Sequence, residues 1–463
     1  MVVGEFTQDA DLLVIGGGPG GYHAAFRAAA NGIATTIVDA EPGLGGVCLH
    51  RGCIPSKTYL SLSETMHAAA ACKTMGIDFG TPKLDVNAIR KWKEQVVSKL
   101  VQGLDSQCKK YKVDRLRGTA RFEDGKHVAI QGGDVPRVKF KRTIIATGSR
   151  SIYLKGVQID SPNVLTSRTA LDLADIPKAL LVIGGGYIGL ELGQVYAAFG
   201  AKVTVVEMTP DLLPGVDRDL ARPLIKRLQE EFAEVCVETK VTGMKEVKGG
   251  IELTFEGKTP PTSKRFDKVL VSVGRRPNSS ELNLDKAGVE ADDRGFIKVD
   301  AGFQTSADRI YAIGDVIGNP MLAHKALHEG TVVADLLAGK KAAFDPRAIP
   351  AVVFTDPAIA WAGVTEAEAK VKNLDIVVRK LPWSASGRAV SLGRTDGLTK
   401  LIVEKSTQRL LGIGLCGVHA GEMIAEGVLA LEMGAVAHDL AAMIHPHPTL
   451  GETIGEAAGM LSE

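Results

Sequence analysis

The chain repeats one supersecondary unit, and this repeat limits its possible folds more than any other feature. Residues 12–39 read LLVIGGGPGGYHAAFRAAANGIATTIVD, and residues 180–207 read LLVIGGGYIGLELGQVYAAFGAKVTVVE. The two segments have the same length and can be aligned without inserting a gap. Each copy contains an apolar strand, a glycine turn, a helix of small residues and a β-branched strand that ends in an acid. This order is typical of a βαβ dinucleotide-binding unit, and two ordinary strand–turn–helix segments would explain it poorly.

Three glycines in each copy have predicted roles. The first permits a tight turn, the second lets the backbone approach a pyrophosphate, and the third lets the helix pack closely on the strand. They are Gly16, Gly18 and Gly21 in the first copy and Gly184, Gly186 and Gly189 in the second. The helix N-terminus then offers unpaired N–H groups to the phosphates. Two such units in one chain suggest a flavin and a nicotinamide cofactor.

The acid that closes each unit is placed to bind a ribose. Asp39 and Glu207 stand at the distance from the glycines at which an acid accepts hydrogen bonds from ribose hydroxyls. Met208 and Thr209 follow Glu207, so no basic residue stands beside it. A 2′-phosphate would meet a carboxylate and find no arginine, and the sequence therefore favours NAD over NADP.

Length and composition indicate a globular protein of several domains. A chain of 463 residues suggests roughly three domains, and 45% hydrophobic with 24% charged residues suits packed cores. A net charge of +1 gives no reason to expect a nucleic-acid or membrane partner. The N-terminus lacks the pattern of a secretory or organelle leader, and Cys72, Cys108, Cys236 and Cys416 are scattered singly. We therefore expect a cytoplasmic protein.

The segment GGVCLHRGCIPSK at 45–57 places Cys48 and Cys53 close together, where they could bind metal, lock a structure or carry electrons. A family resemblance bears on this choice. The chain contains this segment together with the two glycine fingerprints, ATGS at 146–149, the T-x5-Y-A-I-G-D segment that ends at Asp315, and HPTLGE at 447–452. Together they resemble the pyridine nucleotide–disulfide oxidoreductases over essentially the whole chain. The similarity is greatest to members that oxidise the dihydrolipoyl groups of 2-oxoacid dehydrogenase and glycine cleavage complexes and reduce NAD.

The resemblance implies an α/β fold with two Rossmann-like domains and a C-terminal α+β dimerisation domain. It places an FAD domain in 1–150 and 276–347, an NAD domain in 151–275 and the dimerisation domain in 348–463. It also implies a homodimer whose active site is shared between subunits. The lipoyl group would come from an acyltransferase core or a lipoyl carrier protein, since no lipoyl-type domain precedes the first unit.

The two cysteines would then be a redox pair. No metal is expected, because zinc needs three or four ligands and no second Cys or His pair has ligand spacing. A structural disulfide over so short a loop would stabilise the protein by only about 2 kcal/mol. In the family, Cys48 would exchange with the substrate and Cys53 would pass electrons to the flavin. Residues five apart on a regular helix diverge too far for a disulfide, so we expect a distortion at Gly52 and Pro55, and a nearby cation that lowers the thiol pKa values.

The resemblance assigns the remaining site residues. His447 would be the acid–base group and Glu452 would orient it, with His445 as a neighbour, while Lys57 would pair with Glu191 beside the flavin. The FAD site would also include Gly46, Ala120, Thr147, Gly148, Ser149, Asp315, Met321, Leu322, Ala323 and His324. The NAD site would also include Val241 and Gly274.

Two residues depart from the family pattern, and three rival functions are weaker. His50 replaces a usual Asn and could shift a thiolate pKa or only replace a hydrogen bond, and Pro446 replaces a commonly small residue. A glutathione-type reductase would want an arginine-lined NADP site, and a mercuric reductase a vicinal cysteine pair near the C-terminus. A non-catalytic flavoprotein scaffold would have lost its reacting groups, but this chain retains Cys48, Cys53, His447 and Glu452.

Overall fold

The computed structural model describes residues 7–461 of the chain, which divide into two compact units. The first comprises Met1–Thr58, Asn87–Ile152 and Gly274–Asp345, and the second comprises Tyr59–Val86, Tyr153–Val273 and Pro346–Glu463. The expectation about a leader rests in part on residues 1–6, which lie outside the described range. Within that range, no helix has both the length and the apolar character that a bilayer crossing requires.

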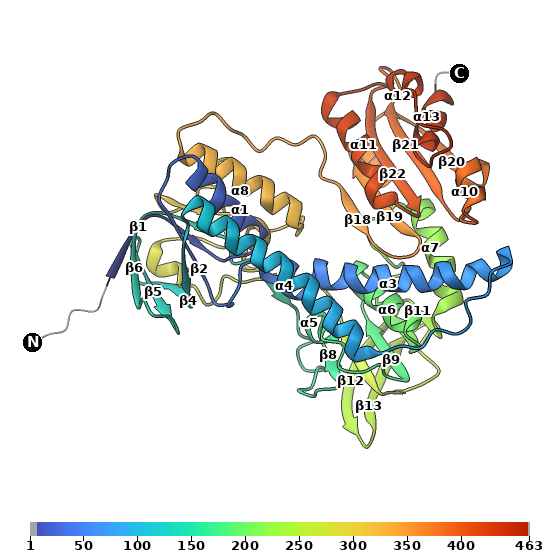
Figure 1. The fold of residues 1–463 in the computed structure, drawn as a ribbon, viewed down its shortest axis with the longest axis horizontal. Coiled ribbons are helices and arrows are strands. Elements are labelled where there is room, and N and C mark those ends of the chain that lie inside the picture. The colour runs from blue at the N-terminus through green and yellow to red at the C-terminus, as the bar shows by residue number, and fades with distance from the viewer. Residues whose placement is uncertain (1–6, 462–463) are drawn as a thin grey trace, which may run out of the picture. The chain divides into compact units, whose positions relative to one another are not determined.

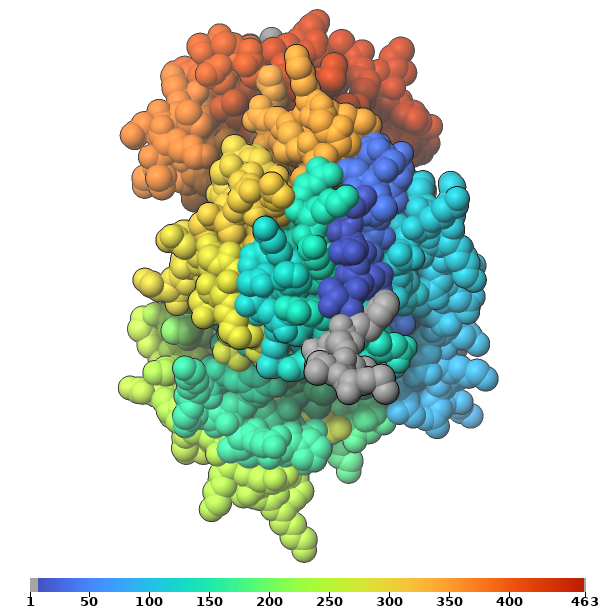
Figure 2. Space-filling model, turned by 90° about the vertical axis from the view of Figure 1, so that its left-hand side faces the viewer, coloured from blue at the N-terminus to red at the C-terminus, as the bar shows by residue number. Residues whose placement is uncertain are grey.

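The first unit is built on a seven-stranded sheet in which the first βαβ copy forms the parallel part. Its strands are β1 (Thr7–Ile15), β2 (Thr35–Asp39), β3 (Asp114–Arg117), β4 (Thr119–Phe122), β5 (His127–Gln131), β6 (Arg137–Ile145) and β17 (Ile310–Ala312). The order is β3-β2-β1-β6-β5-β4, and β17 pairs with β6 in parallel. Figure 2 shows the blue, teal and yellow segments of this unit as one continuous surface, although they are far apart in the sequence.

Small residues let two helices pack closely on this sheet. In α1 (Pro19–Ala30), the buried positions are all glycine or alanine, and α1 lies beside α8 (Ala323–Leu337) (Figure 1). A Cβ at Gly330 of α8 would lie 2.6 Å from the carbonyl oxygen of Gly20. The two helices can therefore approach only because both carry glycine at the contact.

The second βαβ copy forms a separate parallel sheet in the second unit. Its order is β11-β10-β9-β15-β8, and a three-stranded antiparallel sheet β12-β13-β14 accompanies it. The strands are β8 (Val164–Leu165), β9 (Ala179–Ile183), β10 (Lys202–Val206), β11 (Glu234–Cys236), β12 (Thr239–Val247), β13 (Gly250–Gly257), β14 (Arg265–Phe266) and β15 (Lys268–Val271). The helices are α5 (Ser167–Leu171), α6 (Tyr187–Ala198) and α7 (Arg218–Glu231).

The C-terminal residues form a five-stranded antiparallel sheet with helices against it. The sheet order is β18-β19-β22-β21-β20, and α11 packs on β19 and β22 (Figure 1). The strands are β18 (Ala351–Val353), β19 (Ala358–Gly363), β20 (Ile376–Pro382), β21 (Leu398–Glu404) and β22 (Leu410–Gly417). The helices are α9 (Glu366–Val371), α10 (Gly387–Ser391), α11 (Ala420–Met433), α12 (Ala437–Ala442) and α13 (Glu452–Gly459). The predicted fold class is confirmed.

Two long helices connect the parts of the first half of the chain. After the short α2 (Gly46–Arg51), α3 (Cys53–Ala71) runs from the first unit into the second, and α4 (Val86–Tyr111) returns. The sequence from about Thr58 to Lys112 has a helix-like pattern, with apolar residues at helical spacing in IRKWKEQVVSKLVQGL, and it contains parts of two α-helices. The helix that begins at Cys53 continues for 19 residues, so its first turn and its last turn belong to different units.

Candidate functional site

The two glycine turns have the same geometry, and both leave room for a ligand. Gly16 and Gly184 have φ values of +109° and +107°, which favour glycine, and each turn is followed directly by a helix. A Cβ at Gly186 would meet nothing within 4 Å, and one at Gly18 would meet only Gly46 Cα at 3.9 Å. The backbone at the N-terminus of α1 and of α6 is therefore open to a pyrophosphate.

The two closing acids also behave alike. An Asp39 oxygen accepts a hydrogen bond from Gly17 N–H, and Glu207 Oε2 accepts one from Gly185 N–H at 2.7 Å. Glu207 Oε1 accepts two more from Thr209, from its N–H and its hydroxyl, both at 2.8 Å. Each acid is thus fixed at the mouth of its glycine turn, where the ribose of a bound dinucleotide would lie.

The cysteine segment changes direction between its two thiols. Helix α2 ends at Arg51, Gly52 leaves the helical conformation with φ −149° and ψ −117°, and α3 begins at Cys53. A Cβ at Gly52 would lie 2.8 Å from the Val47 carbonyl oxygen, so a side chain there would clash with the preceding turn. The expected distortion is therefore present, and Pro55 stands in the first turn of α3, where its missing N–H costs little.

The segment that carries Cys48 and Cys53 lies directly beside the first glycine turn. A Cβ at Gly46, two residues before Cys48, would lie 2.6 Å from Gly18 Cα, and Gly45 N–H donates to Gly17 O at 2.7 Å. Cys48 is half-buried and Cys53 is exposed, and both are in the thiol form. Whatever occupies the space over Gly18 will therefore be close to the start of α2 and α3.

The pKa of the Cys48 thiol is raised, which differs from the expectation. Its hydrogen bond with Cys53 is the largest cause, followed by burial and the charge of Cys53, and Lys57 only partly opposes them. Two adjacent thiols cannot both ionise easily, because the first thiolate charge disfavours the second. Burial, with the charges of Cys48 and Cys53, also raises the pKa of Tyr22.

His50 makes a structural hydrogen bond. Its Nε2 lies 3.1 Å from both the Gly43 and the Leu44 carbonyl oxygens. Carbonyls only accept, so Nε2 carries the proton and donates to this pair. The ring thus holds the loop before α2, and of the two predicted effects of His50 the hydrogen bond is the one that the structure contains.

The ATGS segment is joined to Asp315 by an arginine that the sequence did not single out. Ser149 donates to an Asp315 carboxylate oxygen, and Arg275 donates to the Ser149 hydroxyl and carbonyl oxygens, at 2.7 Å each. Arg275 Nε also lies 4.0 Å from Asp315 Oδ2. Two neighbours of Ser149 bond Asn278, which lies three residues after Arg275. The Thr147 hydroxyl donates to the Asn278 carbonyl oxygen, and the Gly148 carbonyl oxygen accepts from Asn278 N–H at 2.9 Å. The VGRRPN motif at 273–278 was the signal that could have indicated Arg275.

The predicted MLAH residues lead into α8, whose first turns hold a buried ion pair. Met321 and Leu322 precede the helix, and Ala323 and His324 begin it. Lys325 Nζ lies 2.9 Å from Glu329 Oε1, and both side chains are almost wholly buried. Glu329 Oε2 accepts from Gly314 N–H at 2.7 Å, which fixes the turn that presents Asp315.

The remaining predicted cofactor residues are two buried core residues and a glycine at the boundary between the two units along the chain. The side chains of Ala120 and Val241 are buried in the hydrophobic cores of their sheets. Gly274 has φ +120° and begins the return of the chain to the first unit. Lys57 belongs to the first unit and Glu191 to the second, so their pairing stays a prediction, as does the meeting of His447 with Cys48.

His447 and Glu452 form a hydrogen-bonded pair at the start of α13. His447 Nδ1 lies 2.8 Å from Glu452 Oε1, and the His447 side chain is 83% exposed. Glu452 Oε2 accepts from Thr449 N–H at 2.7 Å, and this bond, with the one to His447, lowers the pKa of Glu452. Because a carboxylate only accepts, Nδ1 carries the proton and Nε2 can accept another.

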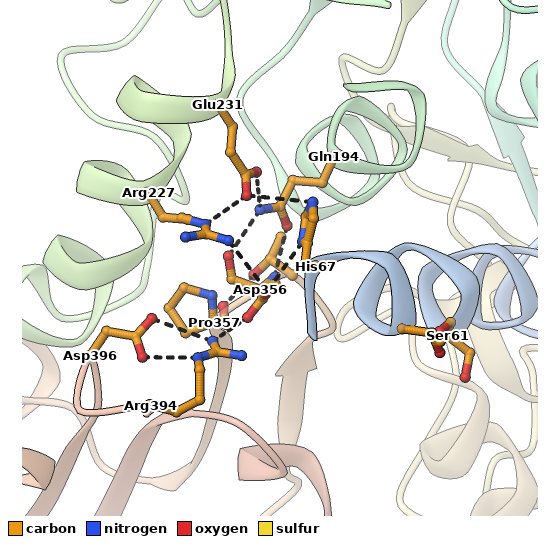
Figure 3. Close-up of polar contacts among 11 residues, drawn as sticks. Ser61, His67, Gln194, Arg227, Glu231, Asp356, Pro357, Arg394 and Asp396 are labelled. Carbon is orange, nitrogen blue, oxygen red and sulfur yellow. Dashed lines mark hydrogen bonds and ion pairs between the residues drawn. The ribbon is translucent and has the colours of Figure 1, made fainter. Parts of the chain in front are cut away.

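A polar cluster, which we call the Asp356 junction, joins α3, α6 and α7 to the turn between β18 and β19 (Figure 3). Asp356 Oδ2 lies 3.3 Å from His67 Nδ1 on α3, and its other oxygen accepts from Arg394. Gln194 on α6 bonds the Asp356 N–H and carbonyl oxygen at 2.8 and 2.9 Å. One turn earlier on α6, Glu191 Oε1 accepts from Phe354 N–H at 2.9 Å.

Burial alone would raise the pKa of Asp356, but its partners outweigh this effect. The hydrogen bond from His67 and the charges of Arg394 and Arg227 hold the pKa at about 2. Glu231 completes the junction, since it bonds Arg227 Nε at 2.6 Å and Gln194 Nε2 at 2.8 Å. The junction therefore consists of charges that are paired within the protein.

A group of three carboxylates has the spacing of a cation site but encloses a lysine. Asp217, Asp219 and Glu366 approach one another closely, and Lys400 Nζ lies 2.7, 3.0 and 2.5 Å from their oxygens. The Lys400 side chain is 1% exposed. Its ammonium group supplies the positive charge that these acids need, so this cluster is an ion-pair network between α7, α9 and β21.

Comparison with known proteins matches this geometry to a family. The sequence pattern described as pyridine nucleotide-disulphide oxidoreductase matches residues 10–330, and that of its dimerisation domain matches residues 349–458. A protein of Vibrio parahaemolyticus named dihydrolipoyl dehydrogenase is 44% identical over 97% of this chain and 95% of its own length. One of Haemophilus influenzae with the same name is 45% identical over 96% of this chain and 94% of its own length.

Solved structures agree in fold. LpdA from Mycobacterium tuberculosis superposes with a TM-score of 0.89 at 25% identity, covering 98% of this chain and 99% of that one. The flavoprotein disulfide reductase RclA from Escherichia coli, described as HOCl-induced, superposes with a TM-score of 0.87 at 27% identity, covering 97% and 99% of the two chains.

Proposed function

The chain belongs to the pyridine nucleotide-disulphide oxidoreductase family, and from this premise we propose that it oxidises protein-bound dihydrolipoyl groups to lipoyl groups and reduces NAD. As a flavoprotein disulfide oxidoreductase it uses FAD and NAD. The observation that carries the proposal is the position of Cys48 and Cys53. They flank Gly52 at the start of α3, and their segment contacts the open glycine turn at Gly18.

The residues of the chain divide the reaction into thiol chemistry and proton transfer. With Cys48 and Cys53 joined in a disulfide, a substrate thiolate attacks the Cys48 sulfur and displaces Cys53 as a thiolate. The second substrate thiolate then displaces Cys48, which releases the cyclic disulfide and leaves both cysteines reduced. His447 Nε2 accepts the proton of the substrate thiol, while Glu452 holds Nδ1–H and stabilises the charged ring.

When bound, FAD would supply the two-electron redox chemistry that links the reduced cysteine pair to NAD. The protein's part is to place the groups that hold each cofactor. Gly18 and Asp39 belong to the first glycine turn and its closing acid, Ser149 and Asp315 are hydrogen-bonded to each other, and Gly186 and Glu207 stand at the second turn. The open space over Gly18 and Gly186 fits the pyrophosphates of both cofactors.

The partners follow from the same premise. The dimerisation domain supports a homodimer. We propose that His447 of each subunit serves the cysteines of the other, and that the substrate arm comes from a lipoyl-bearing acyltransferase core or carrier protein. A cytoplasmic location also stays a prediction from the sequence.

A steady-state assay of NAD-dependent dihydrolipoamide oxidation tests the proposal, with NADP and glutathione disulfide as controls. We expect turnover with dihydrolipoamide and NAD, and no comparable rate with either control. A preference for glutathione disulfide and NADPH would instead support a glutathione-type reductase and refute the proposal. The relatives' shared name and the carboxylate of Glu207 both favour the first outcome.

A further inference from the structure

The loop between α12 and α13 contains two histidines, and each is paired with a glutamate of a neighbouring helix. His445 Nε2 lies 2.9 Å from Glu426 Oε1 on α11, and its side chain is 8% exposed. His447, two residues later, bonds Glu452 on α13 and is 83% exposed. The first ring is therefore built into the domain, whereas the second projects from it.

His447 needs an anchor on its N-terminal side. Residues 443–450 form no helix or strand, so no ladder of backbone hydrogen bonds fixes this loop to another element. Among the contacts of the described residues, the Pro446 carbonyl oxygen accepts only from the Thr449 hydroxyl of the same loop, at 2.8 Å. On its C-terminal side, Glu452 and Thr449 hold it. On its N-terminal side, Ile444 is 95% exposed and can contribute little packing. His445 is the residue nearest to His447 on this side whose side chain is buried and bonded to another element.

Two glycines of the next segment shape the space for the His445 ring. A Cβ at Gly455 of α13 would lie 2.9 Å from His445 Cε1, and a Cβ at Gly451 would lie 3.5 Å from Cδ2. The ring thus lies against the start of the helix that carries Glu452. The bond between His445 and Glu426 ties the ring to α11 as well. The N-terminal side of the loop is therefore attached to α11 and α13, and α13 also carries Glu452, which holds the C-terminal side.

We propose that His445, held by Glu426, is a positioning residue that fixes His447 for proton transfer. This inference rests on the proposed function, because it assumes that His447 is the acid–base group. Glu426 only accepts hydrogen bonds when ionised, so His445 Nε2 donates its proton and is committed to this bond. His445 acts through the backbone of the loop, over two residues, and does not touch the reacting sulfurs.

Substitutions of the pair give the first test. Glu426→Ala removes the acceptor, and His445→Phe keeps the ring volume without the donor. We expect kcat for dihydrolipoamide oxidation to fall roughly 10- to 100-fold in both, since small misplacements of a catalytic group cost this much. Glu426→Gln keeps a carbonyl acceptor and should stay within about threefold of wild type. The exposed His438→Asn on α12 is the matched control and should not change the rate.

Gly455→Ala separates positioning from loss of stability. Alanine is favoured over glycine within a helix, so the substitution should not lower the unfolding temperature on helix propensity. Its methyl group would nevertheless displace the His445 ring, and kcat should fall as in Glu426→Ala. NADH oxidation by ferricyanide, which needs the cofactors but not the thiol proton transfer, should stay near wild type in all variants and shows that they are folded.

A double-mutant cycle decides the outcome. If His445 acts through His447, His445→Phe in a His447→Gln background should cause no further loss of kcat. The inference is overturned if His445→Phe and Glu426→Ala turn over at the wild-type rate, or if His445→Phe lowers the rate by the same factor in both backgrounds. A His447→Gln protein with the wild-type rate would instead refute the proposed role of His447 itself.

Discussion

At the scale of single residues, Glu207 shows how a side chain can select a cofactor. A carboxylate has about four acceptor sites, and three of those of Glu207 are filled by Gly185 and Thr209. The remaining site can accept a hydrogen bond from a ribose hydroxyl. It cannot accept a phosphate, which brings a negative charge and no proton to share at neutral pH.

We therefore predict that NAD exceeds NADP in kcat/KM by roughly 100-fold or more, because like charges in contact cost several kcal/mol. Glu207→Gln keeps an acceptor for Gly185 N–H but removes the charge, so it should narrow this ratio, chiefly through faster use of NADP. Initial rates with both cofactors measure the effect. Equal rates with NAD and NADP in the wild-type protein would contradict the assignment.

A second prediction concerns the thiols. Cys53→Ser removes one sulfur of the proposed disulfide, so dihydrolipoamide oxidation should fall below about 0.1% of wild type, because no disulfide remains to exchange. FAD content, measured by absorbance, should be unchanged. Cys72→Ser is a matched control, since Cys72 lies in a 3₁₀ turn at the far end of α3. Wild-type turnover in Cys53→Ser would refute the mechanism.

The sequence predicted those features of the site that are formed by residues close together in the chain. The two glycine turns, the Gly52 distortion and the His447–Glu452 pair can be read from short segments, because each is formed by neighbours in the chain. A local motif could have indicated Arg275, but not its bond to Ser149, which is 126 residues away. Glu426 could not be found in this way, because its partner His445 is 19 residues away on another element. The raised pKa of Cys48 also depends on three-dimensional proximity to Cys53.

At the scale of elements, the Asp356 junction ties the helix that begins at Cys53 and the helix that begins at the second glycine turn to the C-terminal sheet. The repeated βαβ unit predicted the second of these helices, and the first lies partly in a stretch expected to be helical from about Thr58. Neither pattern contains information on which polar residues meet. The strand LTKLIVEK illustrates the same limit. Its alternation predicts an antiparallel strand, which is confirmed, yet Lys400 is buried because three carboxylates surround it.

We predict that Asp356→Asn lowers the free energy of unfolding by about 2 kcal/mol at pH 7. The pKa of Asp356 is about 2 in the folded protein, against an ordinary value of 3.8. A depressed pKa stabilises the fold above the unfolded value, and this stabilisation disappears as the pH falls from about 4 to about 2. The urea midpoints of the two proteins should therefore converge over that range.

The exposed Asp375→Asn supplies the control for this measurement. The Asp375 carboxylate lies 3.9 Å from Lys405 Nζ on the surface, so its substitution should change stability by less than about 0.5 kcal/mol at any pH. If Asp356→Asn behaved like Asp375→Asn, the paired charges of the junction would contribute nothing to stability.

At the scale of the whole molecule, the proposed active site would combine residues of two chains. His447 is on the exposed surface of the part that matches the dimerisation domain, and Cys48 and Cys53 belong to the other unit of the chain. In a twofold dimer, every contact between the subunits occurs twice. If a residue of the first subunit meets a site on the second, the same residue of the second subunit meets the same site on the first. Each of the two sites would then combine the cysteines of one subunit with the histidine of the other.

This arrangement predicts complementation between inactive variants. Cys48→Ser and His447→Gln homodimers should each lose roughly 10²-fold or more of their activity, the usual effect of removing a nucleophile or a general base. In a heterodimer of the two, one site carries both substitutions and the other carries neither. Differently tagged subunits, mixed, reassembled and purified through both tags, should regain up to half of the wild-type activity per dimer. If such heterodimers bind FAD and remain as inactive as their parents, His447 does not act across the interface, and each subunit would have to complete its own site.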